Sequence, residues 1–214
     1  MQSSRRLIII SMVCSLSSLS LPGRADEIQN AVPAARESCS PASVGRKPAW
    51  KTVTIGAFKD YFRLRNALDE ANIAVGTSAD EILARPSFEV SRKRIDYELV
   101  SYSANDLGFG EDRVPQSQIY ERARCLGLQL SVTEIAPMLR LAYREQPLNE
   151  VIIVAMEPRK TYEGEPVVLS LAHFATGAKR KGLMLLGGDG HPETKVSATM
   201  PFVFVRPREV AVKR

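Results

Sequence analysis

The sequence has few of the side chains on which catalytic and metal sites most often depend. It holds two histidines, three cysteines and one tryptophan among 214 residues. No cysteines or histidines stand at the spacing of a zinc site, and neither a phosphate-binding loop nor a Gly-x-Ser-x-Gly elbow occurs. These absences argue against the well-marked classes of zinc enzyme, phosphate-loop protein and α/β-hydrolase. We expect no cofactor and no metal.

Long apolar runs are also scarce. The most extended run, residues 7–21, is shorter than the roughly 20 apolar residues of a membrane-spanning helix, and five serines interrupt it. Arg5 and Arg6 precede it, and small residues lead to a cleavage site between Ala25 and Asp26. This is the layout of a secretory signal peptide. We expect a cleaved, exported protein, periplasmic or secreted, with twin-arginine export and a retained anchor as alternatives.

An excess of one charge is missing once the signal peptide is removed. Residues 1–25 hold three arginines and no acid, so their loss lowers the net charge from +5 to +2. The basic triplets, residues 92–94 and 179–181, lie between apolar segments and are expected to be solvated turns. A nucleic-acid partner needs a basic face, which this pattern does not predict. We expect a protein or a cell-envelope component as the partner, with no stable membrane span in the mature chain.

Two cysteines, Cys39 and Cys125, survive the expected cleavage. In an oxidising compartment they are candidates for one disulfide closing a long loop, which would stabilise the fold by about 4 kcal/mol. Cys125 falls near the end of an expected helix, however, where a buried free thiol is common. Both alternatives stay open at the level of the sequence.

The chain divides into four parts. Residues 1–25 are the signal peptide, and residues 26–49 form a leader rich in proline and small polar residues that offers little to a core. Residues 50–208 fit one domain, and residues 209–214 form a basic tail.

Hydrophobic periodicity within the domain changes from helical to alternating along the chain. Steps of three and four residues predict helices over residues 58–71 and 115–126, and capping-box spacing predicts another from Thr77 or Ser78 to Pro86. Alternating or continuous apolar runs predict strands over residues 95–102, 139–144, 151–156, 167–175, 183–186 and 202–205. The expected class is α+β, with N-terminal helices packed on a C-terminal antiparallel β-meander of about five strands.

Several stretches of this domain are similar to those of a group of uncharacterised bacterial proteins. They are residues 107–109, 118–130, 136–150 and 153–158, and the resemblance extends over about residues 50–208. The chain departs from the pattern at residues 131–133, where a cysteine and a proline would be expected. The resemblance implies a shared fold and no activity.

The histidine with the most suggestive neighbours is His191. It lies in a glycine-rich segment with Asp189 and Glu193, so three potential ligands or an acid–base pair stand two residues apart. An Asp-Gly turn between two strands gives the same pattern without any function. His173, by contrast, alternates with Leu169 and Leu171 and is expected to be a core or edge residue.

Without a convergent catalytic set, the sequence favours a non-enzymatic binding or interaction module of the cell envelope or the secreted fraction. Tyr143, Arg144 and Tyr162 are the candidate surface anchors, because aromatic residues and arginine dominate binding hot spots. The alternative is a small metal-dependent or histidine-based hydrolase that uses Asp189, His191 and Glu193. The sequence leaves the ligand and the oligomeric state open.

Overall fold

The computed structural model describes residues 44–176 and 180–207. All of these residues belong to one compact unit. The expected signal peptide, the cleavage site at Ala25 and Asp26, most of the leader including Cys39, and the basic tail lie outside the described residues.

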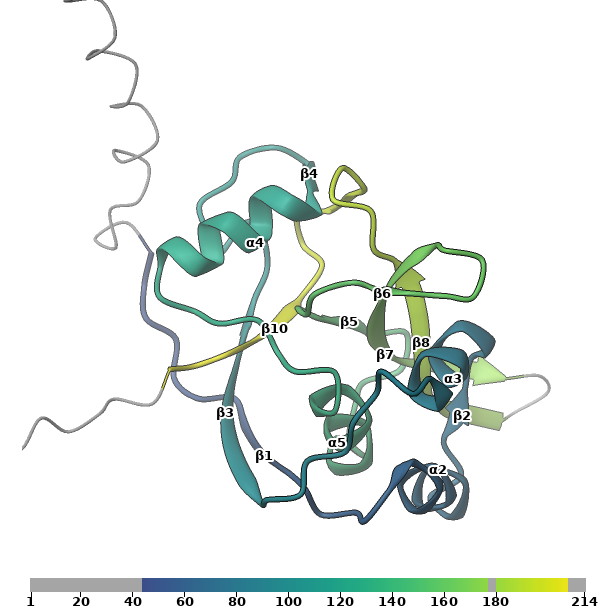
Figure 1. The fold of residues 1–214 in the computed structure, drawn as a ribbon. Coiled ribbons are helices and arrows are strands. Elements are labelled where there is room, and N and C mark those ends of the chain that lie inside the picture. The colour runs from purple at the N-terminus through teal and green to yellow at the C-terminus, as the bar shows by residue number, and fades with distance from the viewer. Residues whose placement is uncertain (1–43, 177–179, 208–214) are drawn as a thin grey trace, which may run out of the picture. The chain divides into compact units, whose positions relative to one another are not determined.

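Helices and strands alternate irregularly along the described chain (Figure 1). In chain order they are β1 Lys51–Ile55, α2 Tyr61–Glu70, β2 Ala74–Val75, α3 Thr77–Ala84, β3 Ile95–Tyr102, β4 Arg113–Pro115, α4 Gln116–Cys125, α5 Ile135–Ala142, β5 Val151–Val154, β6 Arg159–Lys160, β7 Pro166–Thr176, β8 Arg180–Asp189, β9 Lys195–Ser197 and β10 Phe202–Val205.

Eight of these strands form one mixed sheet. Its order is β1-β3-β10-β5-β7-β8-β2, and β6 pairs with β7 beside this path. β10 runs antiparallel to β3 and parallel to β5, and the short β2 runs parallel to β8. The remaining two strands, β4 and β9, pair with each other in a separate ribbon. The last strand of the described chain, β10, therefore lies inside the sheet, between two strands from the middle of the chain.

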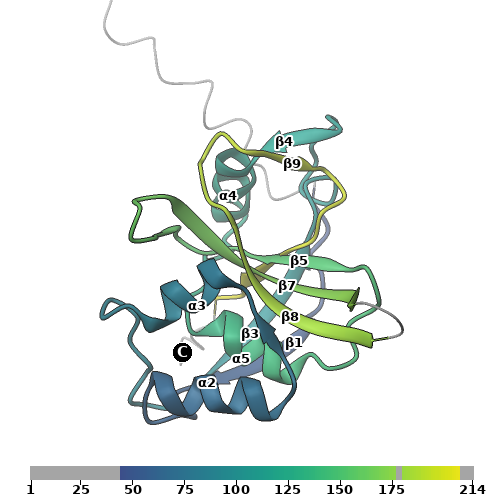
Figure 2. The same cartoon turned by 90° about the vertical axis from the view of Figure 1, so that its right-hand side faces the viewer.

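The helices cover opposite faces of this sheet. α2, α3 and α5 lie on one face, whereas α4 and the β4–β9 ribbon lie on the other (Figure 2). Two hydrophobic clusters match these layers. The larger one joins α2, α3 and α5 to the sheet, and the smaller one joins α4 to β3 and β10.

The central strand β10 belongs to both clusters, and all four of its residues are buried. Phe202 and Phe204 pack on the α4 side, where the Tyr120 ring meets them edge-on at 6.1 and 6.4 Å between centroids. Val203 and Val205 pack on the opposite side. An uninterrupted apolar run is the expected sequence of a strand that is covered on both faces.

The expected architecture, N-terminal helices packed on a C-terminal meander, is wrong. The described chain enters the sheet at β1 before any helix of the domain, and β1 pairs with β3 from Lys51↔Leu99 to Ile55↔Ile95. The late strands do not run as a meander either, because β10 leaves its neighbours in sequence and inserts between β3 and β5. Short strands such as β1, with two buried residues, carry too little periodicity to be recognised.

The strand expected over residues 139–144 is also wrong, because these residues belong mostly to α5. The alternation of Leu139, Leu141 and Tyr143 with Arg140, Ala142 and Arg144 suggested one buried face. Arg140, however, is fully buried, so burial follows the helical repeat instead of a period of two. Pro137 is accommodated because it lies in the first turn of the helix, where its missing N–H costs nothing.

Other elements agree with the sequence prediction within a few residues. β3 has the predicted bounds, and α2, α3 and α4 fall inside or close to the expected helices. α3 begins without the expected capping box: its N-cap residue is Gly76, and no side chain caps it. The predicted strands over residues 151–156, 167–175, 183–186 and 202–205 correspond to β5, β7, β8 and β10.

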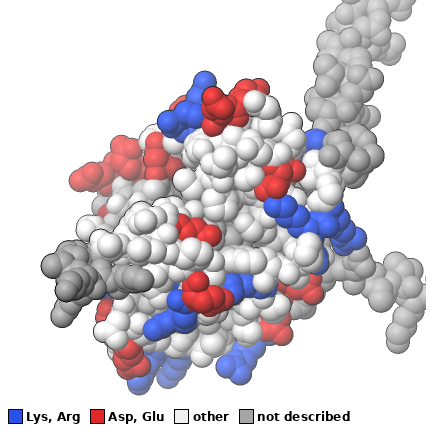
Figure 3. All heavy atoms as spheres, turned by 180° about the vertical axis from the view of Figure 1, so that it is seen from behind, with Lys and Arg blue, Asp and Glu red and all other residues white. Residues whose placement is uncertain are grey.

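Charges of both signs are interspersed on the face opposite to the view of Figure 1 (Figure 3). None of the described helices is both long and apolar enough to cross a membrane.

Candidate functional site

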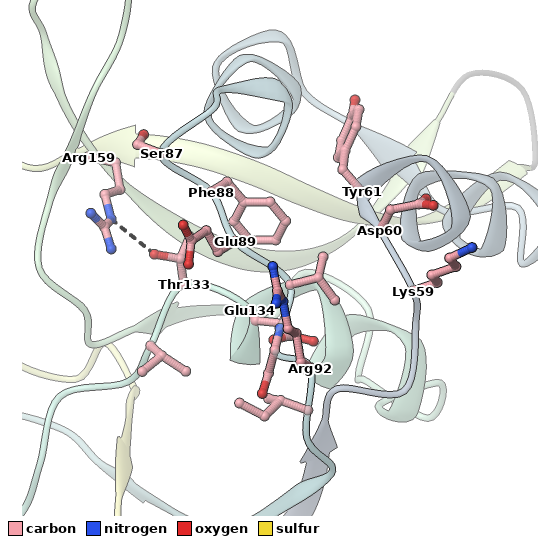
Figure 4. Close-up of a pocket in the computed structure, with 14 residues that line it drawn as sticks. Lys59, Asp60, Tyr61, Ser87, Phe88, Glu89, Arg92, Thr133, Glu134 and Arg159 are labelled. Atoms are coloured by element: carbon pink, nitrogen blue, oxygen red, sulfur yellow. Dashed lines mark hydrogen bonds between the residues drawn. The ribbon is translucent and has the colours of Figure 1, made fainter.

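A cavity of about 770 Å³ lies among three segments that are distant in the sequence. Residues 59–61 at the start of α2 form one wall, residues 87–92 between α3 and β3 form the second, and residues 132–134 before α5 form the third (Figure 4). Ile55 at the end of β1 and Arg159 in β6 complete the lining. This volume is within the range of pockets that hold small molecules.

Glu134 holds the cavity walls together. Its side chain is 3% exposed, and its carboxylate accepts two backbone hydrogen bonds. The Gly56 amide donates to Oε1 and the Ser91 amide donates to Oε2, each at 2.8 Å. The carboxylate thus ties the end of β1 and residues 87–92 to the start of α5. A buried carboxylate that accepts charge-assisted bonds from fixed amides is a structural clamp.

Gly56 is suited to this clamp by its backbone conformation. Its φ angle is +72°, and a Cβ atom there would stand 2.1 Å from the Lys93 carbonyl oxygen. Only glycine fits such a close approach at a positive φ. The chain therefore turns sharply at the cavity edge between β1 and α2.

Thr133 and Arg159 join the third wall to β6. Arg159 Nε donates to Thr133 Oγ1 at 3.1 Å, and Figure 4 shows this bond at one end of the cavity. Thr133 is 7% exposed, whereas the Arg159 side chain is exposed. A buried hydroxyl therefore fixes the orientation of an exposed guanidinium.

The opposite end of the cavity is formed by the first turn of α2. Asp60 is the N-cap residue, and its carboxylate accepts the Arg63 amide at 2.9 Å. The Tyr61 hydroxyl donates to Asp80 Oδ1 at 3.1 Å. Partial burial, with the nearby Asp80 carboxylate as the second cause, raises the pKa of Tyr61. The Tyr61 phenol is therefore neutral and anchored to α3.

The apolar part of the lining is central. Phe88 lies between the Arg159 end and the Lys59–Tyr61 end in Figure 4. Ile55 is buried, and Val132 is 46% exposed. The cavity therefore offers an apolar surface flanked by charged groups.

The Asp189–His191 segment lies elsewhere and forms a turn after β8. Asp189 Oδ1 accepts from the His191 amide at 2.9 Å and lies 2.7 Å from His191 Nδ1, and Oδ2 accepts from Thr194 Oγ1 at 2.6 Å. Glu165 Oε2 lies 3.9 Å from His191 Nε2. Within the part of the chain that the structure describes, no three ligating side chains form a metal cluster.

Electrostatics in this turn follow from the same contacts. The hydrogen bond to Asp189 raises the pKa of His191. Donation from Thr194, and then from the His191 backbone and side chain, lowers the pKa of Asp189 to about 2. Asp189 is thus engaged by its own turn. The turn joins β8 to β9, which pairs with β4, so it does not form the expected hairpin.

The three candidate surface anchors do not form one patch. Tyr143 is 7% exposed, and its ring packs edge-on against Trp50 at 5.0 Å between centroids. Arg144 is exposed, and its Nη2 donates to the Ala71 carbonyl at 3.0 Å. Tyr162 is 71% exposed beneath the Arg85 guanidinium, 4.4 Å from the ring centroid. Only Arg144 and Tyr162 are exposed as the surface role requires.

His173 is half-buried, with Nδ1 2.5 Å from the Gln146 carbonyl oxygen. Its partly buried position in β7 agrees with the core or edge position predicted from the sequence.

Sequence reasoning missed the cavity altogether, because its lining comes from segments that only the fold brings together. A weak signal was present at residue 134. A lone glutamate between the apolar residues Val132 and Ile135 either faces solvent or needs strong partners, and here it has two amides.

Comparison of the chain with protein-family models, with curated proteins and with solved structures gave no match.

Proposed function

We propose that this protein is an exported, non-enzymatic binding module whose ligand occupies the cavity bounded by α2, residues 87–92 and residues 132–134. The proposal combines the signal-peptide pattern of residues 1–25 with the cavity. The ligand is retained by a site that is already formed in the folded chain.

The observation that carries the proposal is the Glu134 clamp. Two backbone amides from separate segments bind one buried carboxylate, so the cavity walls are fixed relative to each other before a ligand arrives. Fixing the walls in advance lowers the entropy lost on binding. Glu134 itself is engaged, and the lining contains neither histidine nor cysteine, so its groups are arranged for contact more than for proton transfer.

The alternative, a histidine-based hydrolase, has one observation in its favour: Asp189 orients His191 through a 2.7 Å contact. The same carboxylate is the acceptor for two other donors of its turn, which a purely structural role explains. Loss of a hydrolytic activity in a His191→Ala protein would support this alternative. The cavity is therefore the preferred site.

The test compares how well a ligand is retained by the parent protein, whose cavity is open, and by a variant whose cavity is filled by a larger side chain. Residues 26–214 are immobilised and exposed to a small-molecule extract of the cell envelope, and the eluate is analysed by mass spectrometry. Val132→Trp fills the cavity from an exposed position, and Leu148→Trp adds the same bulk at an exposed site outside the lining.

We expect a compound that is retained by the parent protein and by Leu148→Trp but is lost from Val132→Trp. Equal retention by all three proteins would place binding elsewhere. No retention by any of them would contradict the proposal. Export is checked separately, because cleavage gives a secreted or periplasmic chain whose first residue is Asp26.

A further inference from the structure

We propose that the ligand of the cavity is an organic carboxylate with an adjoining apolar group, an inference that depends on the proposed function of the cavity. It follows from which charges of the lining are already engaged and from where the apolar surface lies.

The cations of the lining are available for a ligand. Lys59, Arg92 and Arg159 are all exposed at the cavity. Within the described residues, none of the three forms an ion pair with a carboxylate, and Arg159 uses only Nε, toward Thr133. The outer edge of the Arg159 guanidinium keeps its paired N–H donors, the geometry that matches a carboxylate.

The acids of the lining are mostly engaged. Glu134 accepts from two backbone amides, and Asp60 accepts from the Arg63 amide at its own helix start. Glu89 is the third acid, and it is exposed. The formal charges of the lining cancel. Within the described residues, however, three cations of the lining and only one of its carboxylates remain to pair with a ligand. An anionic ligand therefore makes more favourable contacts in this cavity than a cationic one.

The apolar surface limits which anion fits. Phe88 stands between the two charged ends (Figure 4), and Val132 adds an exposed aliphatic side chain to the lining. A small, strongly hydrated anion would leave this surface uncovered, whereas an aromatic or aliphatic carboxylate covers it and places its charge at the arginines. Burial of apolar area then adds about 25 cal/mol for each Å² to the electrostatic attraction.

The probe is naphthalene-2-carboxylate, measured by titration calorimetry against residues 26–214. Its charge-reversed partner is 2-naphthylmethylamine, which has the same ring system and an ammonium group. The variants are Arg92→Gln and Arg159→Gln, and Arg113→Gln removes one exposed arginine outside the lining as the matched control. All three side chains are exposed, so the variants should remain folded.

We expect the carboxylate to bind at one site and the amine to bind less tightly. Arg92→Gln and Arg159→Gln should each weaken carboxylate binding by about 2- to 5-fold, in keeping with partly exposed charge contacts. Arg113→Gln should leave it unchanged, and added salt should weaken it. Val132→Trp should abolish binding.

Tighter binding of the amine, with both probes blocked by Val132→Trp, would overturn this inference and leave the cavity as a binding site. Equal weakening by Arg113→Gln would overturn it as well, because the effect would then reflect total charge. Failure of the carboxylate to bind at all would exclude the proposed ligand class, whereas the extract experiment above would still decide whether the cavity binds another class.

Discussion

Arg140 is a residue whose environment contradicts its usual place at the surface. It is fully buried in α5, and its guanidinium donates to the Tyr143 carbonyl and to Gln146 Oε1. Gln146 in turn donates to the Leu171 carbonyl at 3.2 Å. Burial is the main cause that lowers the pKa of Arg140 to about 10. The guanidinium therefore connects the end of α5 to the turn before β5 and to β7.

Replacing this residue should be costly. Arg140→Met keeps much of the volume but leaves the Tyr143 carbonyl and Gln146 Oε1 without their donor, so the free energy of unfolding should fall by about 2–4 kcal/mol. Chemical denaturation measures the change. Arg144→Met, at an exposed site four residues on, removes only the single exposed hydrogen bond to the Ala71 carbonyl and should cost at most about 1 kcal/mol. Equal stability of the two variants would contradict the role assigned to Arg140.

His191 gives a pH-dependent prediction at the same scale. Its pKa is raised, so the stabilisation from its protonated form is complete below its unfolded pKa and is lost as pH rises through the folded pKa. The pKa of Asp189 is lowered to about 2, so its contribution is present above its unfolded pKa and is lost as pH falls toward that value.

An NMR titration of the His191 imidazole should therefore give a pKa above the ordinary value. Asp189→Asn should return it toward about 6.5 because the largest cause of the shift is removed. Glu193→Gln should retain most of the shift, since Glu193 is the smallest of the causes. An unchanged pKa in Asp189→Asn would show that another group perturbs the histidine.

At the scale of elements, the contact between α3 and β8 depends on one glycine. A Cβ atom on Gly187 would stand 2.7 Å from Ser78 Cβ and 2.8 Å from Val167 Cγ1. On the adjacent Gly188 it would meet only the Val168 carbonyl oxygen, at 3.9 Å. The two residues are neighbours in one strand but face different surroundings, which makes them a matched pair.

Gly187→Ala should lower the free energy of unfolding by about 1–3 kcal/mol, because α3 must move away from the sheet. Gly188→Ala should change it by less than about 0.5 kcal/mol, since ordinary van der Waals space is available. Thermal or chemical unfolding of both variants distinguishes them. Similar losses in both would mean that backbone effects in β8, and not helix packing, decide the result.

Helices and strands whose apolar residues recur at a regular spacing could be predicted from the sequence. Elements in which the buried residues do not follow that spacing could not. β3 was placed correctly because Ile95, Tyr97 and Leu99 alternate with Asp96 and Glu98 in its first five positions. α5 was misassigned because the buried Arg140 was read as an exposed residue. The β4–β9 ribbon consists of three-residue strands, which are too short to carry a period. The cavity could not be predicted either, because it is formed by contacts between residues that are distant in the sequence.

At the scale of the whole molecule, the two cysteines of the mature chain are candidates for linking the leader to the domain. The described chain begins at Val44, which packs against the smaller core beside Leu126 and Leu128. Cys125 ends α4 next to these residues, and Cys39 lies five residues before Val44, outside the described part. Five residues span at most about 17 Å, so a Cys39–Cys125 disulfide would hold the leader at this surface.

If the protein is exported as proposed, peptide mapping of the exported chain without reductant should recover Cys39 and Cys125 in one linked fragment. Reduction should then lower the free energy of unfolding by up to about 4 kcal/mol, as expected for closing a long loop. Cys39→Ser should have the same stability with and without reductant. Recovery of both cysteines as free thiols from the exported protein would contradict the pairing.

The central position of β10 has a consequence for the order in which the protein can fold. β10 bridges β3 on one side and β5 on the other, yet it follows every other described strand in the chain. Until residues 202–205 have been made, β3 and β5 therefore lack the strand that joins them in the folded sheet. Contacts between such distant segments also form slowly. If residues 1–25 act as the proposed signal peptide, the nascent chain would still lack its closing strand when it is directed to an export channel, and an incompletely folded chain is the form that such a channel can thread.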